Sequence, residues 1–104
     1  MPWQVAAPVG EINDAVADDC GPFLLADGVH LAFSSTRLGG LGLGDLWYAT
    51  RDGGPFLEPA PLEGVNDPAY DDDPWLSVDG GLVVFASNRV GGGPFDLWMA
   101  DSMK

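Results

Sequence analysis

The sequence predicts an all-β protein made of two copies of one four-stranded antiparallel unit. Three observations support this prediction. Gly and Pro supply 15 and 9 of the 104 residues, a density that excludes long helices. Asp outnumbers Glu by 13 to 3, and Asp favours turns where Glu favours helices. The first half of the chain also recurs in the second half, at a spacing of about 52 residues.

The internal repeat is a series of matching residues in the same order. The shared features are Asp-Gly, Phe, Ser, Arg and Gly-Gly, found at Asp27-Gly28, Phe33, Ser35, Arg37 and Gly39-Gly40, and again at Asp79-Gly80, Phe85, Ser87, Arg89 and Gly91-Gly92. Two further matches are Asn13-Asp14 with Asn66-Asp67 and, after a one-residue slip, Asp45-Leu46-Trp47 with Asp96-Leu97-Trp98. We divide the chain into a first repeat unit, residues 1–52, and a second, residues 53–104.

Each unit is expected to begin with a weak edge strand. Trp3 to Val9 and Phe56 to Leu62 are bounded by prolines, which sheets tolerate best at their edges. The next strand is predicted at Pro22 to Ala26 and at Pro74 to Val78, ending at an Asp-Gly pair. Asp-Gly between apolar runs is a strong hairpin signal because Gly accepts a positive φ angle.

The third and fourth strands of each unit are predicted from apolar runs. Val29 to Phe33 and Leu82 to Ala86 lack clean alternation, which is typical of strands covered on both faces. A glycine-rich loop then leads to Leu46 to Ala49, or to Leu97 to Ala100. Each unit is therefore predicted to form a four-stranded antiparallel sheet.

A four-stranded sheet that repeats every ~40–50 residues is typical of a β-propeller blade. One small sheet with two apolar faces cannot bury them alone, whereas packing between neighbouring blades covers both faces. The predicted fold class is therefore all-β, with two propeller blades in the chain.

The second unit resembles the TolB-type propeller repeat, which reads Pro-x-Leu-Ser-x-Asp-Gly, Phe-x-Ser-x-Arg, Gly-Gly and Asp-aromatic. The matching segments are residues 74–81, 84–89, 91–93 and 96–98. The first unit departs from the pattern at Leu25-Ala26 and at Thr36. The resemblance implies a β-propeller fold. It also implies a role as a binding platform, a component of a protein complex or an accessory domain of a hydrolase.

The resemblance further implies an order of strands within each blade. The strand before the Asp-Gly turn lies nearest the axis, and the outermost strand follows Asp-Leu-Trp. Residues 22–50 with 56–62 then make one blade, which leaves 3–9 alone and 74–100 without a fourth strand. We expect a cyclic homo-oligomer in which each chain donates residues 3–9 to its neighbour. A six-bladed trimer is favoured over a dimer or a tetramer; the alternative is a piece of a longer propeller.

Composition excludes several classes of partner. The net charge is −12 with only four basic residues, which excludes nucleic-acid binding. No stretch approaches the ~20 apolar residues that span a bilayer, and the start lacks the pattern of a signal peptide. Neither nucleic acid nor a membrane is therefore expected as a partner, and a complete chain of this kind would stay in the cytoplasm. Cys20 and His30 are the only residues of their types, which excludes intrachain disulfides and two-histidine zinc motifs.

Two groups of charged residues are candidates for a site. The aspartates at 14, 18 and 19 align with those at 67, 71 and 72, and Asp73 extends the second group. Such clusters suit Ca²⁺, but turn formation is the favoured interpretation, and no metal or cofactor site is assigned. Arg37 and Arg89 recur with Asp45 and Asp96 across the glycine loop, which predicts bidentate ion pairs, with anion capture as the alternative.

No catalytic residue is assigned. His30 with Ser34 or Ser35 suggests a triad, but the Gly-x-Ser-x-Gly pattern is missing. The glycine loops lack the Lys and the helix of a phosphate loop, Cys20 lacks an activating neighbour, and the tryptophans fit interblade packing better than ligand stacking. The predicted function is a non-enzymatic scaffold and binding module for a protein or peptide. Alternatives are a hydrolase accessory fragment and a Ca²⁺-dependent binder of sugars or peptides.

Overall fold

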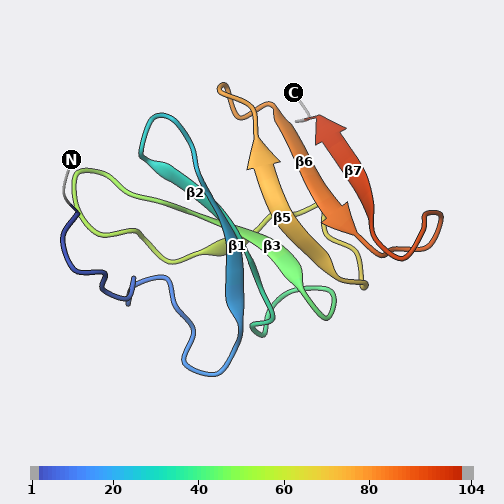
Figure 1. Cartoon of the computed structure of the whole chain (residues 1–104), viewed down its shortest axis with the longest axis horizontal. Coiled ribbons are helices and arrows are strands. Elements are labelled where there is room, and N and C mark those ends of the chain that lie inside the picture. The colour runs from blue at the N-terminus through green and yellow to red at the C-terminus, as the bar shows by residue number, and fades with distance from the viewer. Residues whose placement is uncertain (1–2, 102–104) are drawn as a thin grey trace.

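The computed structural model describes residues 3–101, which form only strands, turns and loops. Seven strands make two antiparallel sheets, one of four strands and one of three (Figure 1). The all-β prediction is confirmed at this level. Within residues 3–101 there is no helix long and apolar enough to cross a membrane.

The first sheet takes its last strand from the second repeat unit. Its strands are β1 (Asp19–Leu24), β2 (His30–Ser35), β3 (Asp45–Thr50) and β4 (Ala60–Pro61), in the order β1-β2-β3-β4. The prediction that residues 22–50 and 56–62 share one sheet is therefore confirmed. Within 56–62 only β4 and an isolated bridge from Arg51 to Phe56 form, because the prolines limit backbone pairing.

The second sheet contains β5 (Asp71–Leu76), β6 (Leu82–Ser87) and β7 (Asp96–Asp101), in the order β5-β6-β7. It repeats the registers of the first sheet: Phe85 pairs with Trp98 as Phe33 pairs with Trp47. Within residues 3–101, no strand pairs with the outer edge of β7. The sheet is thus the three-stranded remainder expected from the sequence.

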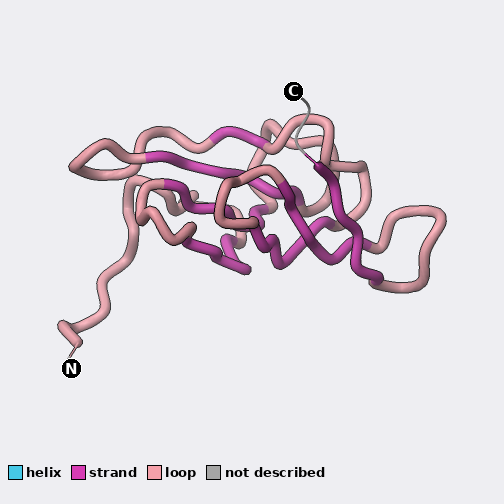
Figure 2. Tube along the Cα trace, turned by 90° about the horizontal axis from the view of Figure 1, so that it is seen from above, coloured by secondary structure: helices cyan, strands magenta, loops and turns pink. Residues whose placement is uncertain are grey.

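Residues 3–9, predicted as an edge strand, form no strand in the single chain. Figure 2 shows the N-terminal segment extending away from the sheets, and 89% of Trp3 is exposed. A proline-bounded edge strand forms only beside a partner strand, and no strand within residues 3–101 pairs with this segment. Its donation to a neighbouring chain remains a prediction.

Strands β1 and β5 are edge strands of their sheets; we call them the inner strands, after the position near the axis that the resemblance implies for them. Both begin about three residues earlier than predicted because each continues through a β-bulge. The register shifts between Cys20 and Phe23, and between Asp72 and Trp75. Gly21 (φ 59°) and Asp73 (φ 51°) occupy the bulges in the left-handed conformation, which Gly and Asp tolerate best.

These bulges correct the sequence alignment of the aspartates. Since the two bulges are equivalent, Asp19 corresponds to Asp71, and Cys20 corresponds to Asp72. The one-residue shift in the predicted alignment arose because the first unit has one more residue between Asp14 and β1 than the second has between Asp67 and β5.

Two apolar clusters hold the fold together. The outer cluster lies on the face of the first sheet that points away from the second sheet, and comprises Ile12, Phe33, Trp47 and Ala49, with Leu31 and Phe56. The inner cluster lies between the sheets and comprises Leu46, Val83 and Phe85, with Leu62, Val65, Leu76, Trp98 and Ala100. Strand β5 contacts β1, β2 and β3. The first sheet therefore has apolar packing on both faces, as predicted for residues 29–33. The second sheet is packed on one face only, whereas covering on both faces was predicted for residues 82–86 as well.

Candidate functional site

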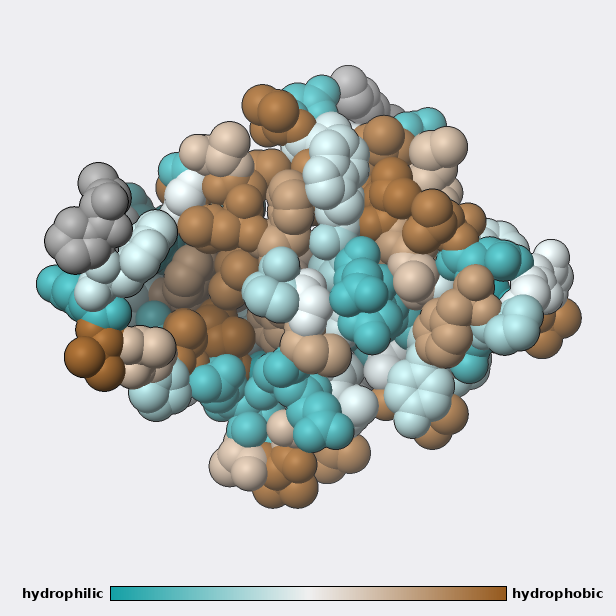
Figure 3. Space-filling view, viewed as in Figure 1, coloured by the Kyte–Doolittle hydropathy of each residue, from teal (hydrophilic) through white to brown (hydrophobic). Residues whose placement is uncertain are grey.

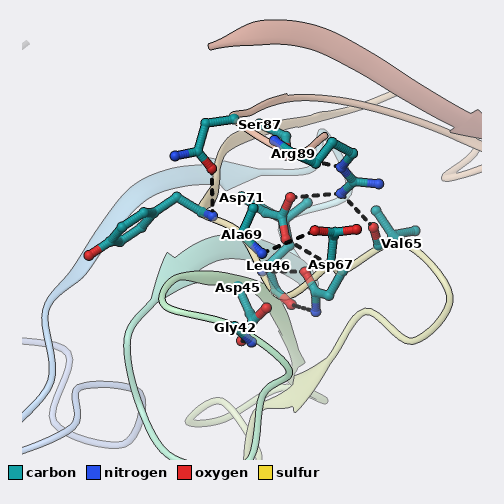
Figure 4. Close-up of polar contacts among 12 residues, drawn as sticks. Gly42, Asp45, Leu46, Val65, Asp67, Ala69, Asp71, Ser87 and Arg89 are labelled. Carbon is teal, nitrogen blue, oxygen red and sulfur yellow. Dashed lines mark hydrogen bonds and ion pairs between the residues drawn. The ribbon is translucent and has the colours of Figure 1, made fainter. Parts of the chain in front are cut away.

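The same polar network surrounds an arginine in each unit. Arg89 follows β6, and its Nη2 donates to Asp71 Oδ1 (2.7 Å) and to the carbonyl of Val65 (2.9 Å). Its Nε donates to Ser87 Oγ (2.9 Å), so the guanidinium ties together three segments of the second unit (Figure 4). The equivalent contacts in the first unit join Arg37 to Asp19, Ile12 and Ser35.

The predicted arginine partners, Asp45 and Asp96, are wrong. Both arginines pair instead with the first residue of the inner strand, and through a single carboxylate oxygen rather than a bidentate fork. The reason is the direction of the guanidinium, which lies over two rings of its own sheet. For Arg89 these are Phe85 (5.0 Å to the centroid) and Trp98 (5.2 Å).

The aspartates at the start of β1 and β5, and those four or five residues before them, bind backbone N–H groups. The second oxygen of Asp71 accepts from Asp67 N (3.0 Å), and Asp67 Oδ1 accepts from Ala69 N (3.0 Å). Asp19 and Asp14 repeat this pattern in the first unit. Within residues 3–101 there is no group of three or more His, Cys, Asp or Glu side chains that could hold a metal ion.

Hydrogen bonding lowers the pKa values of Asp14 and Asp19 in the first unit. The N–H groups of Val16 and Ala17 stabilise the Asp14 carboxylate and lower its pKa. Burial raises the pKa of Asp19, but the hydrogen bonds from Arg37 and from Asp14 N outweigh it, so the net shift is downward. Both groups therefore add stability at neutral pH that is lost as the pH falls through their lowered pKa values.

Asp45 lies in the contact between the two units. Only 1% of the residue is exposed; its Oδ2 accepts from Gly42 N (3.1 Å), and its Oδ1 has no hydrogen-bond partner among residues 3–101. A Cβ at Gly42 would lie 2.5 Å from the carbonyl oxygen of Ala69, so the glycine loop of the first unit rests directly on the second. Burial, and then the nearby Asp71, raise the pKa of Asp45.

We expect Asp45→Asn to stabilise the protein increasingly as the pH rises. In the wild type the raised pKa means that the folded protein favours the protonated Asp45 carboxyl. The contribution of Asp45 to folding stability is therefore complete below pH 3.8 and is lost as the pH rises through the raised pKa. The amide keeps an oxygen for Gly42 N and carries no charge. Urea denaturation of both proteins between pH 4 and 8 measures the difference, and a constant difference across this range would contradict the prediction.

Asn66 fastens the two units together and was not singled out from the sequence. Its Oδ1 accepts from Leu46 N (2.7 Å) and its Nδ2 donates to Leu46 O (3.0 Å). Leu46 O also accepts from Leu62 N (3.0 Å), and Gly44 O accepts from Asp71 N (2.8 Å). The match of Asn13 with Asn66 was visible in the repeat, but its purpose depends on the neighbouring sheet.

The remaining sequence candidates lie apart from one another. His30 is the first residue of β2, and its Nδ1 contacts Oδ2 of Asp27 (2.7 Å) in the exposed turn before that strand. Ser34 lies near the other end of that strand, about 13 Å along it, and its Oγ accepts from Asp73 N (3.2 Å). The structure therefore does not bring a Ser-His-Asp triad together. Burial, and then Asp72, raise the pKa of the exposed Cys20, so its thiolate is disfavoured.

The aromatic residues serve two kinds of contact. Trp47 and Trp98 pack in the apolar clusters, and the buried indole N–H of each finds no acceptor in the described part of the chain. Trp75 is half-exposed and contacts Phe23 of the first sheet (6.0 Å between centroids), so it does lie between the units. Tyr48 is partly exposed on the face of β3 that carries Leu46.

The candidate functional surfaces are thus those that join one repeat unit to the next. At the junction inside the chain, Asp45 and Leu46 of the first unit are buried against the second unit. Their counterparts on β7, Asp96 and Leu97, are exposed. Leu46 is completely buried, whereas 79% of Leu97 is exposed. No family model matches the chain, and no curated protein matches it either.

Proposed function

We propose that the chain is a two-blade β-propeller module that acts as a non-enzymatic scaffold, closing into a ring with further copies of itself. The carrying observation is the division of seven strands into four and three. The first sheet is completed by β4 from the second unit, and the second sheet ends at the open edge of β7. This is the division expected of a TolB-type repeat that starts with its outermost strand.

The stacking of the two sheets supports this proposal. Adjacent propeller blades pack face to face, and the inner cluster is a contact of this kind. The opposite face of the second sheet carries Leu97 and Met99, both largely exposed. Figure 3 shows hydrophobic residues at the surface over β6 and β7. An apolar face of this kind requires a partner, and a third blade is the partner that the repeat supplies.

The N-terminal segment is the proposed fourth strand of the second sheet, donated by another chain. In the first sheet, β4 pairs Pro61 with Trp47 and Ala60 with Tyr48. The same dipeptide, Ala7-Pro8, lies 53 residues earlier and is exposed. Placed on β7, it would pair with Trp98 and Met99 in the same register, which is the predicted strand exchange.

Two blades per chain permit rings of two, three or four chains, because propellers have about four to eight blades. We favour three chains, since six blades are common in the propellers that the repeat resembles. The ring face and the axial opening would then form the binding surface for a protein or peptide ligand.

We expect the protein at micromolar concentration to have the mass of three chains, each of 10.9 kDa. Size-exclusion chromatography with light scattering measures this mass directly. Deleting residues 3–9 should reduce it to that of a single folded chain, because the fourth strand of the second sheet is then missing. A single-chain mass for the wild type would refute the proposed function.

A further inference from the structure

The junction between the two units has a donor side and a receiver side. The donor side belongs to the first unit and consists of Leu46, Asp45 and the glycine loop that precedes them. The receiver side belongs to the second unit. Its apolar part is formed by Leu62, Val65, Val83 and Phe85, which belong to the same cluster as Leu46. Asn66 binds the backbone of Leu46, and residues 67–69 contact the glycine loop.

A second donor side lies exposed at the C-terminal end of the molecule. Leu97, Asp96 and residues 91–95 occupy the equivalent positions on β7 and its glycine loop, and all are exposed. The internal geometry of this side is already formed, since Gly93 N donates to Asp96 Oδ2 as Gly42 N donates to Asp45. Because β6 and β7 share the register of β2 and β3, the N–H and C=O of Leu97 point to the open edge.

A second receiver side lies at the N-terminal end of the molecule. It is a hollow of about 210 Å³ lined by Val9, Ile12, Asn13, Asp19, Cys20, Pro22, Leu31 and Phe33. These positions correspond to Leu62, Val65, Asn66, Asp71, Asp72, Pro74, Val83 and Phe85. Four of them, Leu62, Val65, Val83 and Phe85, belong to the inner cluster that contains Leu46. Asn13 is exposed, and its amide makes no hydrogen bond within residues 3–101.

The receiver side is preformed in the same turn conformation. Val9 O accepts from Ile12 N (3.0 Å) and from Asn13 N (2.9 Å). In the junction, Leu62 O accepts from Val65 N and Asn66 N in the same way. The turn that presents Asn66 to Leu46 therefore also presents Asn13, without any rearrangement of the chain.

We propose that Leu97 of one copy inserts into this hollow of a second copy, where Asn13 binds the backbone N–H and C=O of Leu97. This inference rests on the proposed function and specifies its contact residue by residue. The glycine loop 91–95 then covers residues 14–17 of the second copy, and Asp96 is buried as Asp45 is buried. Because donor and receiver are different surfaces, the contact is heterologous, the type of contact from which a ring is built when its rotation closes.

The occupant is a second copy because both sides repeat the junction within the chain. Leu46, Asn66, Phe85, Asp45 and Asp71 have identical counterparts in Leu97, Asn13, Phe33, Asp96 and Asp19. The aliphatic positions 62, 65 and 83 are replaced by other aliphatic residues, Val9, Ile12 and Leu31, and Cys20 replaces Asp72. A different protein would have to reproduce the Asp-Leu-Trp strand and its glycine loop to make the same contacts.

Two substitutions at exposed positions test the contact. We expect Leu97→Asp to raise the dissociation constant of the assembly about a hundredfold, since a buried leucine is replaced by a charge. Asn13→Ala should raise it about tenfold through the loss of two hydrogen bonds. Leu57→Asp, at an exposed leucine outside both sides, is the matched control and should leave it unchanged. Sedimentation velocity over a dilution series measures the constants, and circular dichroism verifies the fold of each variant.

Cross-linking places the two residues directly against each other. In a Cys20→Ser background, Asn13→Cys and Leu97→Cys are made in separate proteins, mixed, and treated with a short bismaleimide. A covalent dimer should form in the mixture and in neither protein alone. The wild type could assemble while the mixture stays unlinked and Leu97→Asp and Asn13→Ala also assemble normally. That result would show that this contact is wrong while the ring proposal stands. A wild type that is a single chain at micromolar concentration overturns both.

Discussion

Arg89→Ala is expected to destabilise the protein by about 3 kcal/mol or more. The side chain of Asp71 is completely buried, and Arg89 is its only cationic partner within residues 3–101. Removing one member of a buried ion pair leaves an uncompensated charge, which typically costs 3–5 kcal/mol. The variant also loses the hydrogen bond to Ser87 of β6 and the hydrogen bond to the Val65 carbonyl, which joins the second sheet to the segment before it.

Urea denaturation at one fixed protein concentration measures this effect, because assembly adds to apparent stability. Arg51→Ala is the matched control. Arg51 lies over Phe56 and donates from Nε to Gly28 O (2.7 Å), but it has no carboxylate partner within residues 3–101, so about 1 kcal/mol is expected. Equal losses in the two variants would show that the Arg89–Asp71 pair has no special weight.

Gly42→Ala and Gly93→Ala are expected to act on different levels of the structure. A Cβ at Gly42 would lie 2.5–2.6 Å from backbone atoms of residues 67–69, so the junction must open, at a cost of about 3 kcal/mol. For a Cβ at Gly93, the nearest atoms belong to the Asp96 side chain, at 3.3 Å. Gly93→Ala should therefore fold normally, and yet fail to assemble because the same overlap arises with the second copy.

Thermal unfolding and light scattering separate these two outcomes. Gly54→Ala is the silent control, since nothing lies within 4 Å of its added Cβ. Gly42→Ala should melt early, whereas Gly93→Ala should keep its circular dichroism spectrum and show a single-chain mass. A Gly93→Ala protein with the mass of the wild type would contradict the proposed packing of the second glycine loop.

The strand pattern was predictable from local sequence because the Asp-Gly turns and apolar runs determine it. The two turns placed the hairpins correctly, and the position of residues 56–62 gave the division into four and three strands. The extension of β1 and β5 through their bulges was missed, since prediction began both strands at prolines 22 and 74. Residues 3–9 were expected as a strand, but strand formation there needs a partner that the chain itself does not supply.

The contacts of the charged side chains were less predictable because they depend on strand register. Asp19 faces Ser35 across the β1–β2 pair, and Asp71 faces Ser87 across β5–β6, which brings each carboxylate to the following arginine. A spacing of 18 residues between acid and arginine carries no local signal. Sequence proximity across the glycine loop favoured Asp45 instead, which in fact binds the loop backbone.

The paired β-bulges also bear on the symmetry of the proposed ring. A bulge increases the right-handed twist of its strand, and Gly21 and Asp73 place it at the same point in β1 and β5. The two units therefore share the same local twist. A symmetric ring built from both units needs them to be equivalent, and the matching left-handed residues at 21 and 73 provide this equivalence within one chain.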